Sequence, residues 1–280
     1  MYCFINDQFR LQQHVGFPVD DLAVQRGYGI FDYLRVANKV PLYINDHLDR
    51  FYHSAKEMRL RVPYDLTEMK NLVASLIEKN DLSEAGIRII LSGGASPDGY
   101  QLVQPNLVIL SEKISIPGNT ISGKGYHLIS YPHQRQLAQV KTTDYLMAIW
   151  LKPRIIEQGG DDVIYHQGGM ITECPRSNIF MVSKTDTLFT PCHQILKGIT
   201  RKLALTLAEK NGIAVEERNI SIDELKTAKE VFITSSTKRL IPVASIDHHP
   251  LPVFSHGSLT ARLYEYFYAH EKNYIADHHF

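Results

Sequence analysis

The sequence predicts a mixed α/β protein of two domains, and two observations lead to that prediction. The chain has 280 residues, whereas an ordinary domain holds roughly 100–200. Helical and strand-like apolar patterns alternate along it, with no internal repeat and no low-complexity tract. The apolar share of 44% is enough to build cores of that size. The alternation is only partial, so a doubly wound parallel sheet is not required.

The first part of the chain predicts two helices and two buried strands. Residues 46–59 place apolar side chains at helical spacing. Asp65, with Glu68 three residues later, resembles a capping box at the start of a second helix. Residues 87–91 and 107–110 are short apolar runs typical of buried strands. The turn-rich stretch at 114–122 then predicts an interdomain linker.

Beyond the linker, apolar runs predict further strands, and longer periodic segments predict helices. Gly212 is expected to follow the C-terminus of one helix as its left-handed C′ residue. The predicted strands are 126–131, 163–166, 179–183, 187–190 and 230–234, and the predicted helices are 143–157, 200–211 and 258–270.

Charge and composition exclude several classes of protein. Lysine plus arginine and aspartate plus glutamate number 30 each, and this balance argues against a surface for nucleic acid or anionic membrane. No apolar run approaches the roughly 20 residues of a membrane helix, and no signal peptide is visible. Three cysteines are too few for a disulfide framework. We therefore expect a cytoplasmic protein.

The 13 histidines do not form a metal motif. No H-E-x-x-H and no C-x-x-C occurs, so solvated histidines are expected and no metal site is predicted. The glycine pairs do not fit a phosphate fingerprint either, and turns are the simpler interpretation.

Two other segments are candidate anion sites. Residues 196–201 (Leu-Lys-Gly-Ile-Thr-Arg) place glycine and threonine where a helix begins, and the free N–H groups there attract phosphate. Residues 234–237 (Thr-Ser-Ser-Thr) follow a strand with a run of hydroxyl groups. Ordinary capping is the alternative for each segment. Together they point weakly to one phosphorylated ligand.

Six motifs in order resemble those of the class IV aminotransferases, the pyridoxal-phosphate enzymes of fold type IV. That family includes branched-chain aminotransferases, D-amino acid transaminases, R-selective amine transaminases and aminodeoxychorismate lyases. The resemblance covers nearly the whole chain. It implies a small N-terminal α/β domain at 1–113, a larger domain at 123–280 that binds the cofactor, and a homodimer. The motifs lie at 46–51, Lys141, 173–180, 188–191, 195–201 and 232–237.

The resemblance also implies which residues hold pyridoxal 5'-phosphate. Lys141 matches the lysine that forms the aldimine and then moves the proton, and Glu173 matches the carboxylate at the pyridine nitrogen. A carboxylate there keeps the ring nitrogen protonated, as the electron-sink chemistry requires. Tyr145 is a candidate for the cofactor's phenolic oxygen, although its spacing from the lysine differs between subfamilies. The phosphate would be held by Arg50, Ile199, Thr200, Ser236 and Thr237.

Three arginines are candidate ligands of substrate carboxylates. Arg26 stands where the family carries an aromatic residue, in a loop that approaches the neighbouring subunit's site in those enzymes. Arg88 stands where D-amino acid transaminases carry a tyrosine, on a strand whose apolar neighbours make an unpaired arginine unexpected. Arg176 lies close to Glu173. We expect bidentate binding of carboxylates, and the alternative for each arginine is an ion pair with an acid of the chain.

This pattern favours a D-amino acid transaminase acting on D-alanine or D-glutamate and a 2-oxo acid. An aminodeoxychorismate lyase remains an alternative, because its substrate is also an anion. A branched-chain L-amino acid aminotransferase is a second alternative, although three arginines fit an apolar side-chain pocket poorly. A cofactor-binding protein without activity is the non-enzymatic alternative.

Overall fold

The computed structural model describes residues 1–121, 123–252, 255 and 257–278. The chain divides into two compact units. Unit 1 comprises Met1–Ile116, Val140–Asp144 and Asn273–Phe280, and unit 2 comprises Pro117–Gln139 and Tyr145–Lys272. The predicted ranges miss the return of 140–144 and the chain end to the first unit, because a sequence pattern does not show which sheet a short segment joins. Ser122, in the predicted linker, lies outside the described residues.

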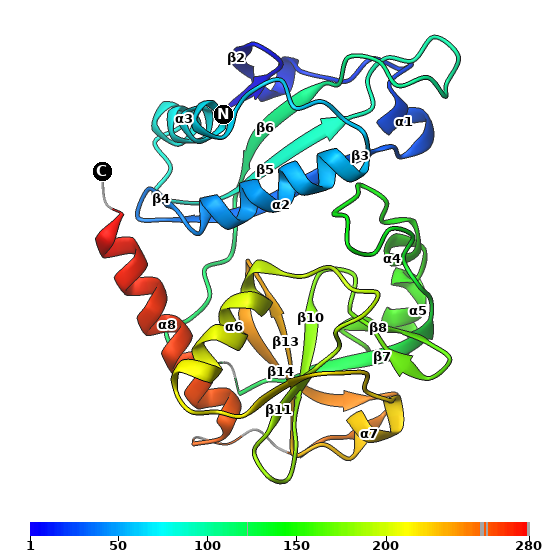
Figure 1. The fold of residues 1–280 in the computed structure, drawn as a ribbon, viewed down its shortest axis with the longest axis vertical. Coiled ribbons are helices and arrows are strands. Elements are labelled where there is room, and N and C mark those ends of the chain that lie inside the picture. Colours follow the sequence, from blue (N-terminus) through cyan, green and yellow to red (C-terminus); the bar gives the residue numbers. More distant parts are fainter. Residues whose placement is uncertain (122, 253–254, 256, 279–280) are drawn as a thin grey trace. The chain divides into compact units, whose positions relative to one another are not determined.

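Unit 1 is built on a six-stranded antiparallel sheet in the order β2-β1-β6-β5-β3-β4 (Figure 1). Helices α2 and α3 pack their apolar faces on one side of this sheet and form a core with it. The strands are β1 (Tyr2–Ile5), β2 (Gln8–Leu11), β3 (Gly29–Ala37), β4 (Val40–Pro41), β5 (Glu84–Ser92) and β6 (Leu107–Glu112), and the helices are α1 (Leu22–Arg26), α2 (Ile44–Glu57) and α3 (Leu66–Lys79), with a 3-10 turn at Gln12–His14.

Unit 2 contains a nine-stranded mixed sheet in the order β12-β11-β10-β13-β14-β7-β8-β9, with β15 paired to β14. Helices α6 and α8 pack against it around Phe180 and Phe232, whose rings stack at 5.0 Å. The strands are β7 (Tyr126–Pro132), β8 (Asp162–Gln167), β9 (Met170–Ile171), β10 (Asn178–Val182), β11 (Leu188–Thr190), β12 (Val215–Glu217), β13 (Glu230–Ser235), β14 (Arg239–Ile246) and β15 (His249–Pro250), and the helices are α4 (Leu146–Trp150), α5 (Lys152–Glu157), α6 (Ile199–Lys210), α7 (Ile222–Lys226) and α8 (Leu259–Asp277).

Local sequence signals fix several element ends as predicted. The Asp65 side chain accepts from the Glu68 N–H and the Glu68 side chain accepts from the Asp65 N–H, so the capping box is confirmed. Gly212 follows the C-cap of α6 with a φ of +70°, as expected of a C′ glycine. Each signal acts within four residues, which is why it can be read without the tertiary structure.

The helix predicted at 143–157 was wrong in its extent. The chain forms two shorter helices, α4 and α5, and the first begins only at Leu146. Pro153 stands in the first turn of α5, where its missing N–H costs nothing. The same ring cannot continue a preceding helix, so α4 ends before it. The residues from Val140 to Asp144 belong to unit 1.

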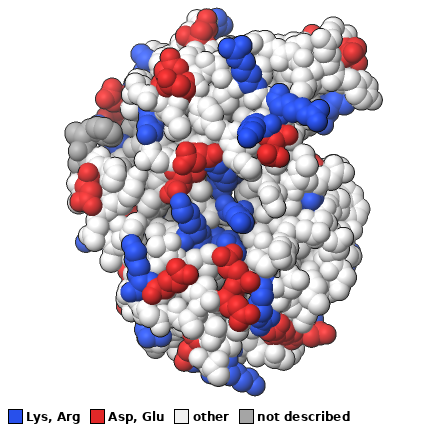
Figure 2. Space-filling model, in the orientation of Figure 1, with Lys and Arg blue, Asp and Glu red and all other residues white. Residues whose placement is uncertain are grey.

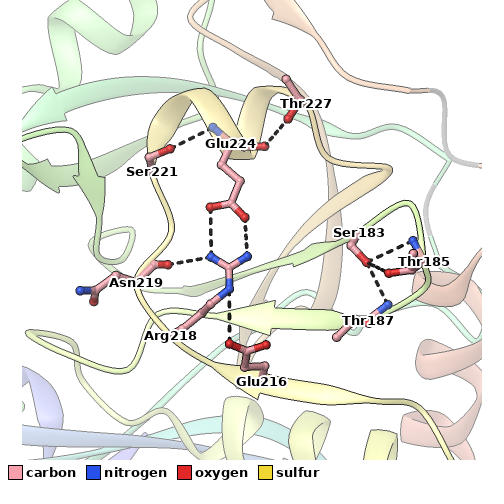
Figure 3. Close-up of polar contacts among 9 residues, drawn as sticks. All are labelled: Ser183, Thr185, Thr187, Glu216, Arg218, Asn219, Ser221, Glu224 and Thr227. Atoms are coloured by element: carbon pink, nitrogen blue, oxygen red, sulfur yellow. Dashed lines mark hydrogen bonds and ion pairs between the residues drawn. The ribbon is translucent and has the colours of Figure 1, made fainter.

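Polar side chains fix two connections of unit 2 (Figure 3). The Ser183 hydroxyl accepts from the N–H groups of Thr185 and Thr187 at 3.2 and 3.1 Å, which closes the turn between β10 and β11. Arg218 pairs with both carboxylate oxygens of Glu224 ahead of α7. The hydrogen bond from Arg218 lowers the pKa of Glu224. The Ser183 turn and the Arg218–Glu224 pair both stabilise local loop conformations at the surface, and neither is assigned a functional role.

On the face drawn in Figure 2, acidic and basic side chains are interspersed. Among the described residues, no helix combines the length and apolar character needed to cross a membrane. The described part of the chain also contains no group of three or more potential metal ligands.

Candidate active site

Lys141 lies in a short segment that unit 1 holds against the start of β3. Its carbonyl accepts from the Phe31 N–H at 3.0 Å, and its N–H donates to the Ser54 hydroxyl of α2 at 3.3 Å. Thr142 forms an isolated bridge with Ile30. The Lys141 Nζ lies 4.5 Å from the centroid of the Phe31 ring. The backbone of this lysine is therefore fixed on both sides, while its ammonium group lies over an aromatic face.

Arg50 belongs to a buried polar group beneath α2. Its Nε and Nη2 both donate to Asp32 of β3 at 2.8 Å. The same carboxylate accepts from His47 Nδ1 at 2.7 Å and from the Tyr33 N–H at 2.7 Å. His47 and Arg50 are three residues apart on one helical face, so one helix supplies both partners. Asp32 is fully buried, so its four hydrogen bonds replace the water it has lost.

The charges in this group follow from the pKa shifts. Burial by itself would raise the pKa of Asp32, but the charge of Arg50 and the hydrogen bonds from Arg50 and His47 hold that pKa well below its usual range. Burial lowers the pKa of His47, and the positive charges of Arg50 and Lys141 lower it further against the pull of Asp32. At neutral pH the group is an aspartate, an arginine cation and a neutral histidine. Because an ionised carboxylate only accepts hydrogen bonds, His47 Nδ1 carries the proton.

Arg88 lies on the other face of the same sheet, and Arg26 lies at the end of α1. Arg88 donates from Nε and Nη2 to the two oxygens of Glu112, at 2.6 and 3.1 Å. This is the alternative that the sequence left open, an ion pair with the chain's own acid. Its guanidinium also lies 5.3 Å from the centroid of the Phe31 ring. Arg26 is exposed, with its guanidinium 5.4 Å from the ring centroid of Tyr100.

Glu173 is held from two directions in unit 2. One oxygen accepts from Arg135 Nε at 2.8 Å, and the other accepts from the Leu196 N–H at 3.0 Å. Arg135 also donates from Nη2 to the Ala138 carbonyl at 2.6 Å. The Glu173 side chain is only 6% exposed, and that of Arg135 is 16% exposed. The arginine thus compensates a buried carboxylate whose orientation the backbone of 196 also fixes.

Helix α6 begins after a glycine that gives it no side-chain cap. The helix begins at Ile199, after the N-cap Gly198, which has no side chain to offer a capping hydrogen bond. The Asn178 Oδ1 accepts from the Gly198 N–H at 3.2 Å and Nδ2 donates to the Leu196 carbonyl, which fixes the loop ahead of the helix. A Cβ on Gly198 would lie 2.3 Å from Asn178 Oδ1, so this approach requires glycine. Ile199 and Thr200 are both buried at this end.

Two hydroxyl groups at the end of β13 lack partners among the described residues. Thr234 Oγ1 and Ser235 Oγ are both buried and make no hydrogen bond there. A buried hydroxyl without a partner costs about 1–3 kcal/mol, so a ligand that accepts from it recovers that cost. Thr234 lies on the same face of the strand as Phe232, which packs in the core that α6 shares. Ser236 and Thr237 follow in the turn to β14.

The two remaining predicted site residues are Tyr145 and Arg176. Tyr145 is the N-cap of α4, without a side-chain capping bond, and is half-buried. Arg176 is exposed at the tip of the tight turn that Cys174 and Ser177 close. Unit 1 thus brings Lys141 and Arg88 together at one ring, and unit 2 brings Glu173 near the segment that leads to Ile199.

Sequence reasoning missed the residues that stand behind the predicted ones. These are Asp32, His47, Glu112, Arg135 and Asn178. A signal existed for His47, at three residues from Arg50, and for Asp32, an acid within an apolar strand. No sequence signal points to Arg135 or Glu112, because each meets its partner only in the folded chain.

The residues present fit pyridoxal phosphate in their chemistry. Unit 1 offers a fixed lysine, and unit 2 offers a carboxylate that a cation already compensates. The partnerless hydroxyls of Thr234 and Ser235, with a helix N-terminus in the same unit, are donors that a phosphate would accept from.

Comparison with known proteins agrees with these observations. The family model described as Amino-transferase class IV matches residues 29–246. A D-alanine aminotransferase of Listeria monocytogenes serotype 4b (strain F2365) is 29% identical over 278 residues, covering 95% of each chain. A solved protein of Legionella pneumophila (Philadelphia 1), provisionally named a 4-amino-4-deoxychorismate lyase, is 26% identical with a TM-score of 0.82, covering 90% of this chain and 94% of that one.

The same fold occurs with bound cofactor in a more distant neighbour. A branched-chain amino acid aminotransferase of T.th., solved with pyridoxamine 5'-phosphate, has a TM-score of 0.87 at 23% identity, covering 98% of this chain and 96% of that one. The family match spans well over half of the chain. This protein therefore belongs to the class IV aminotransferases and is a pyridoxal-phosphate-dependent aminotransferase of fold type IV.

Proposed function

We propose that this enzyme transfers an amino group between a D-amino acid, of the D-alanine or D-glutamate type, and a 2-oxo acid. The observation that supports this most is the placement of Lys141 and Arg88 against the same ring, Phe31. A cation that can bind a carboxylate then lies beside the lysine that reacts with the amino group. The similarity to D-alanine aminotransferases points to the same substrate class.

The proposed cofactor ligands are residues whose contacts are described above. Arg50 is a proposed phosphate ligand of unit 1. In unit 2 the proposed phosphate ligands are the N-terminus of α6 at Ile199 and Thr200 and the hydroxyls of Ser236 and Thr237. Tyr145 is the proposed neighbour of its phenolic oxygen. Bound pyridoxal phosphate supplies an electron sink for the charge that develops at the substrate Cα.

The remaining steps belong to the chain's own groups. Glu173 holds the proton at the pyridine nitrogen, and Arg135 compensates that carboxylate. Lys141 Nζ would move the proton between the substrate Cα and C4′ of the cofactor. Arg88, Arg26 and Arg176 bind carboxylates, and Arg26 does so in the neighbouring subunit of a homodimer. Each arginine orients the substrate so that its Cα–H bond meets the lysine.

Two other activities of the family remain as alternatives. An aminodeoxychorismate lyase would use the same lysine and carboxylate and would eliminate pyruvate. A branched-chain L-amino acid aminotransferase would place an apolar side chain where the proposal has charge, and the Arg88–Glu112 pair beside Phe31 disfavours it. We also propose a cytoplasmic location, and an interdomain linker at 114–122.

A half-reaction separates these activities. The holoenzyme is mixed in turn with D-alanine, D-glutamate, L-leucine and aminodeoxychorismate, and the absorbance of the bound cofactor is followed. We expect conversion with the two D-amino acids. Conversion by L-leucine alone would rule out the proposal, and pyruvate release without a 2-oxo acid acceptor would identify the lyase.

The Lys141→Ala variant tests the residue assignment. Because no other group is proposed to move the Cα proton, turnover should fall by at least about 10³-fold, within the range that one acid–base group contributes. The matched control is Lys39→Ala, which removes an exposed lysine paired with Asp81 in the same unit. Normal turnover by Lys141→Ala would remove the mechanism.

A further inference from the structure

A cluster of charged and aromatic side chains lies on the face of the unit 1 sheet opposite α2 and α3. We call Phe31, Tyr33, Arg88 and Glu112 the Arg88 cluster. The Arg88 guanidinium carbon lies 5.3 Å from the Phe31 ring centroid and 5.0 Å from that of Tyr33. Lys141 Nζ lies over the same Phe31 ring. All these residues belong to unit 1, so one rigid sheet fixes their spacing.

The two rings are enough to hold the guanidinium in place. Tyr33 and Arg88 are direct cross-strand partners of β3 and β5, and their side chains share one face. Gly86 leaves room for the Tyr33 ring, because a Cβ there would lie 1.8 Å from the tyrosine hydroxyl. Cation–π contacts with both rings orient the arginine, each worth about 0.5–1 kcal/mol where partly exposed. Arg88 therefore does not depend on Glu112 for its position.

Glu112 instead occupies the arginine as a substrate would. Its two oxygens accept from Nε and Nη2, the parallel pair of hydrogen bonds that an arginine makes with any carboxylate. The pair is partly open to solvent, with side chains 32% and 33% exposed. An ion pair at this exposure is weak enough to exchange with a dissolved carboxylate. The two charges also cancel, which reduces the attraction of Arg88 for an incoming anion.

We propose that Glu112 is an internal competitor for Arg88 and thereby limits how strongly the enzyme binds substrate carboxylates. This inference rests on the proposed role of Arg88. A carboxylate ligand must displace Glu112 or share the guanidinium with it. A substrate without a carboxylate leaves Arg88 paired, so it avoids the cost of an unpaired cation. Glu112 thus reduces the preference of the site for substrates with a carboxylate over simple amines.

The test compares binding of 2-oxoglutarate to the holoenzyme and its Glu112→Gln variant by calorimetry. We expect the dissociation constant to fall about three- to tenfold in the variant, the range that loss of a weak competing ion pair allows. The KM for the amino donor should fall in parallel while kcat changes little, because Lys141 is untouched. Glu112→Asp, which keeps the charge, should remain near the wild type.

A matched control comes from unit 2. Arg218 and Glu224 form a similar pair (Figure 3), with side chains 30% and 35% exposed, and neither residue is a proposed ligand. Glu224→Gln should leave the affinity for 2-oxoglutarate unchanged. Weaker or equal binding by Glu112→Gln would overturn the proposal, since it would make Glu112 an orienting group or a bystander.

Arg88→Ala distinguishes this inference from the proposed function. Alone, it should weaken 2-oxoglutarate binding while cofactor stays bound, and unchanged binding would remove Arg88 from the site. In that background, Glu112→Gln should no longer improve binding, because its effect acts through Arg88. The same improvement with or without Arg88 would contradict the competitor role and leave the transaminase proposal standing.

Discussion

The two units each contain an almost buried ion pair of an arginine and a carboxylate. The arginine is the proposed cofactor ligand in unit 1, and the carboxylate is the proposed cofactor ligand in unit 2. In unit 1, Arg50 is the proposed phosphate ligand and Asp32 stands behind it. In unit 2, Glu173 is the proposed partner of the pyridine nitrogen and Arg135 stands behind it. Asp32 also takes hydrogen bonds from His47 and the Tyr33 N–H, whereas Glu173 takes its second hydrogen bond from the Leu196 N–H.

The difference follows from the charge of the group that each pair would meet. A phosphate is an anion and a protonated ring nitrogen is a cation, so the residue in front carries the opposite sign. Without its partner, the residue that binds the cofactor would be an unpaired buried charge. The oppositely charged partner removes the free-energy cost of burying that charge. The fully buried Asp32 is bound more completely than Glu173. We therefore expect unit 1 to depend on its pair mainly for stability and unit 2 mainly for turnover.

The largest expected effect on stability is that of Asp32→Asn. It removes the charge that compensates Arg50 and should lower the free energy of unfolding of the cofactor-free protein by about 3–5 kcal/mol. Urea unfolding measures this change. The control, Glu112→Gln, breaks the partly exposed pair of the same unit and should cost under about 1 kcal/mol. Equal losses in the two variants would contradict the distinction between these pairs.

Acid should weaken wild-type unit 1 through the same carboxylate. The pKa of Asp32 is lowered in the folded state, so its stabilising contribution is present above the unfolded value, about 3.9, and is lost as pH falls below it. The lowered pKa of His47 has the same sign, with a loss that begins below about 6.5. Unfolding measured from pH 7 to pH 3 should show the loss in wild type. Asp32→Asn should show a shallower decline, and an identical slope would argue against Asp32 as the source.

Replacement of Arg135 sharpens the comparison from the side of unit 2. Arg135→Gln leaves Glu173 with the Leu196 N–H but without its cation, and should lower kcat about tenfold, the value of one charge-assisted hydrogen bond. Glu173→Gln should lower kcat further, because the group in front is itself neutralised. Steady-state kinetics at saturating donor gives both values. A greater loss in Arg135→Gln than in Glu173→Gln would reverse the proposed order of the pair.

The smallest expected effect is at Thr234, whose hydroxyl has no partner among the described residues. Thr234→Val should raise the stability of the cofactor-free protein by about 1 kcal/mol, since it removes an unsatisfied buried group. It should also weaken cofactor binding several-fold if that hydroxyl meets the phosphate. Thr190→Val is the control, because the Thr190 hydroxyl donates to the Ile179 carbonyl and its loss should only destabilise. Unchanged cofactor affinity in Thr234→Val would exclude Thr234 as a ligand.

The sequence predicted much of the fold where local signals decide it. The capping box at Asp65 and the C′ glycine at 212 depend on residues a few positions apart, and both were found. The single helix at 143–157 was wrong because its apolar spacing concealed the effect of Pro153. The site residues were identified by resemblance, and their roles remain predictions.

By itself the sequence determined the family and most of the strongly periodic elements. Motif order and local spacing are contained in the linear chain. Only the tertiary structure decided which charges meet, because Arg88 and Glu112 are 24 residues apart and Arg135 and Glu173 are 38 apart. Ion pairs form where folding brings opposite charges close together, and no local pattern encodes that encounter. Arg88, which was expected to bind a substrate carboxylate, thus forms an ion pair with Glu112 of the same chain.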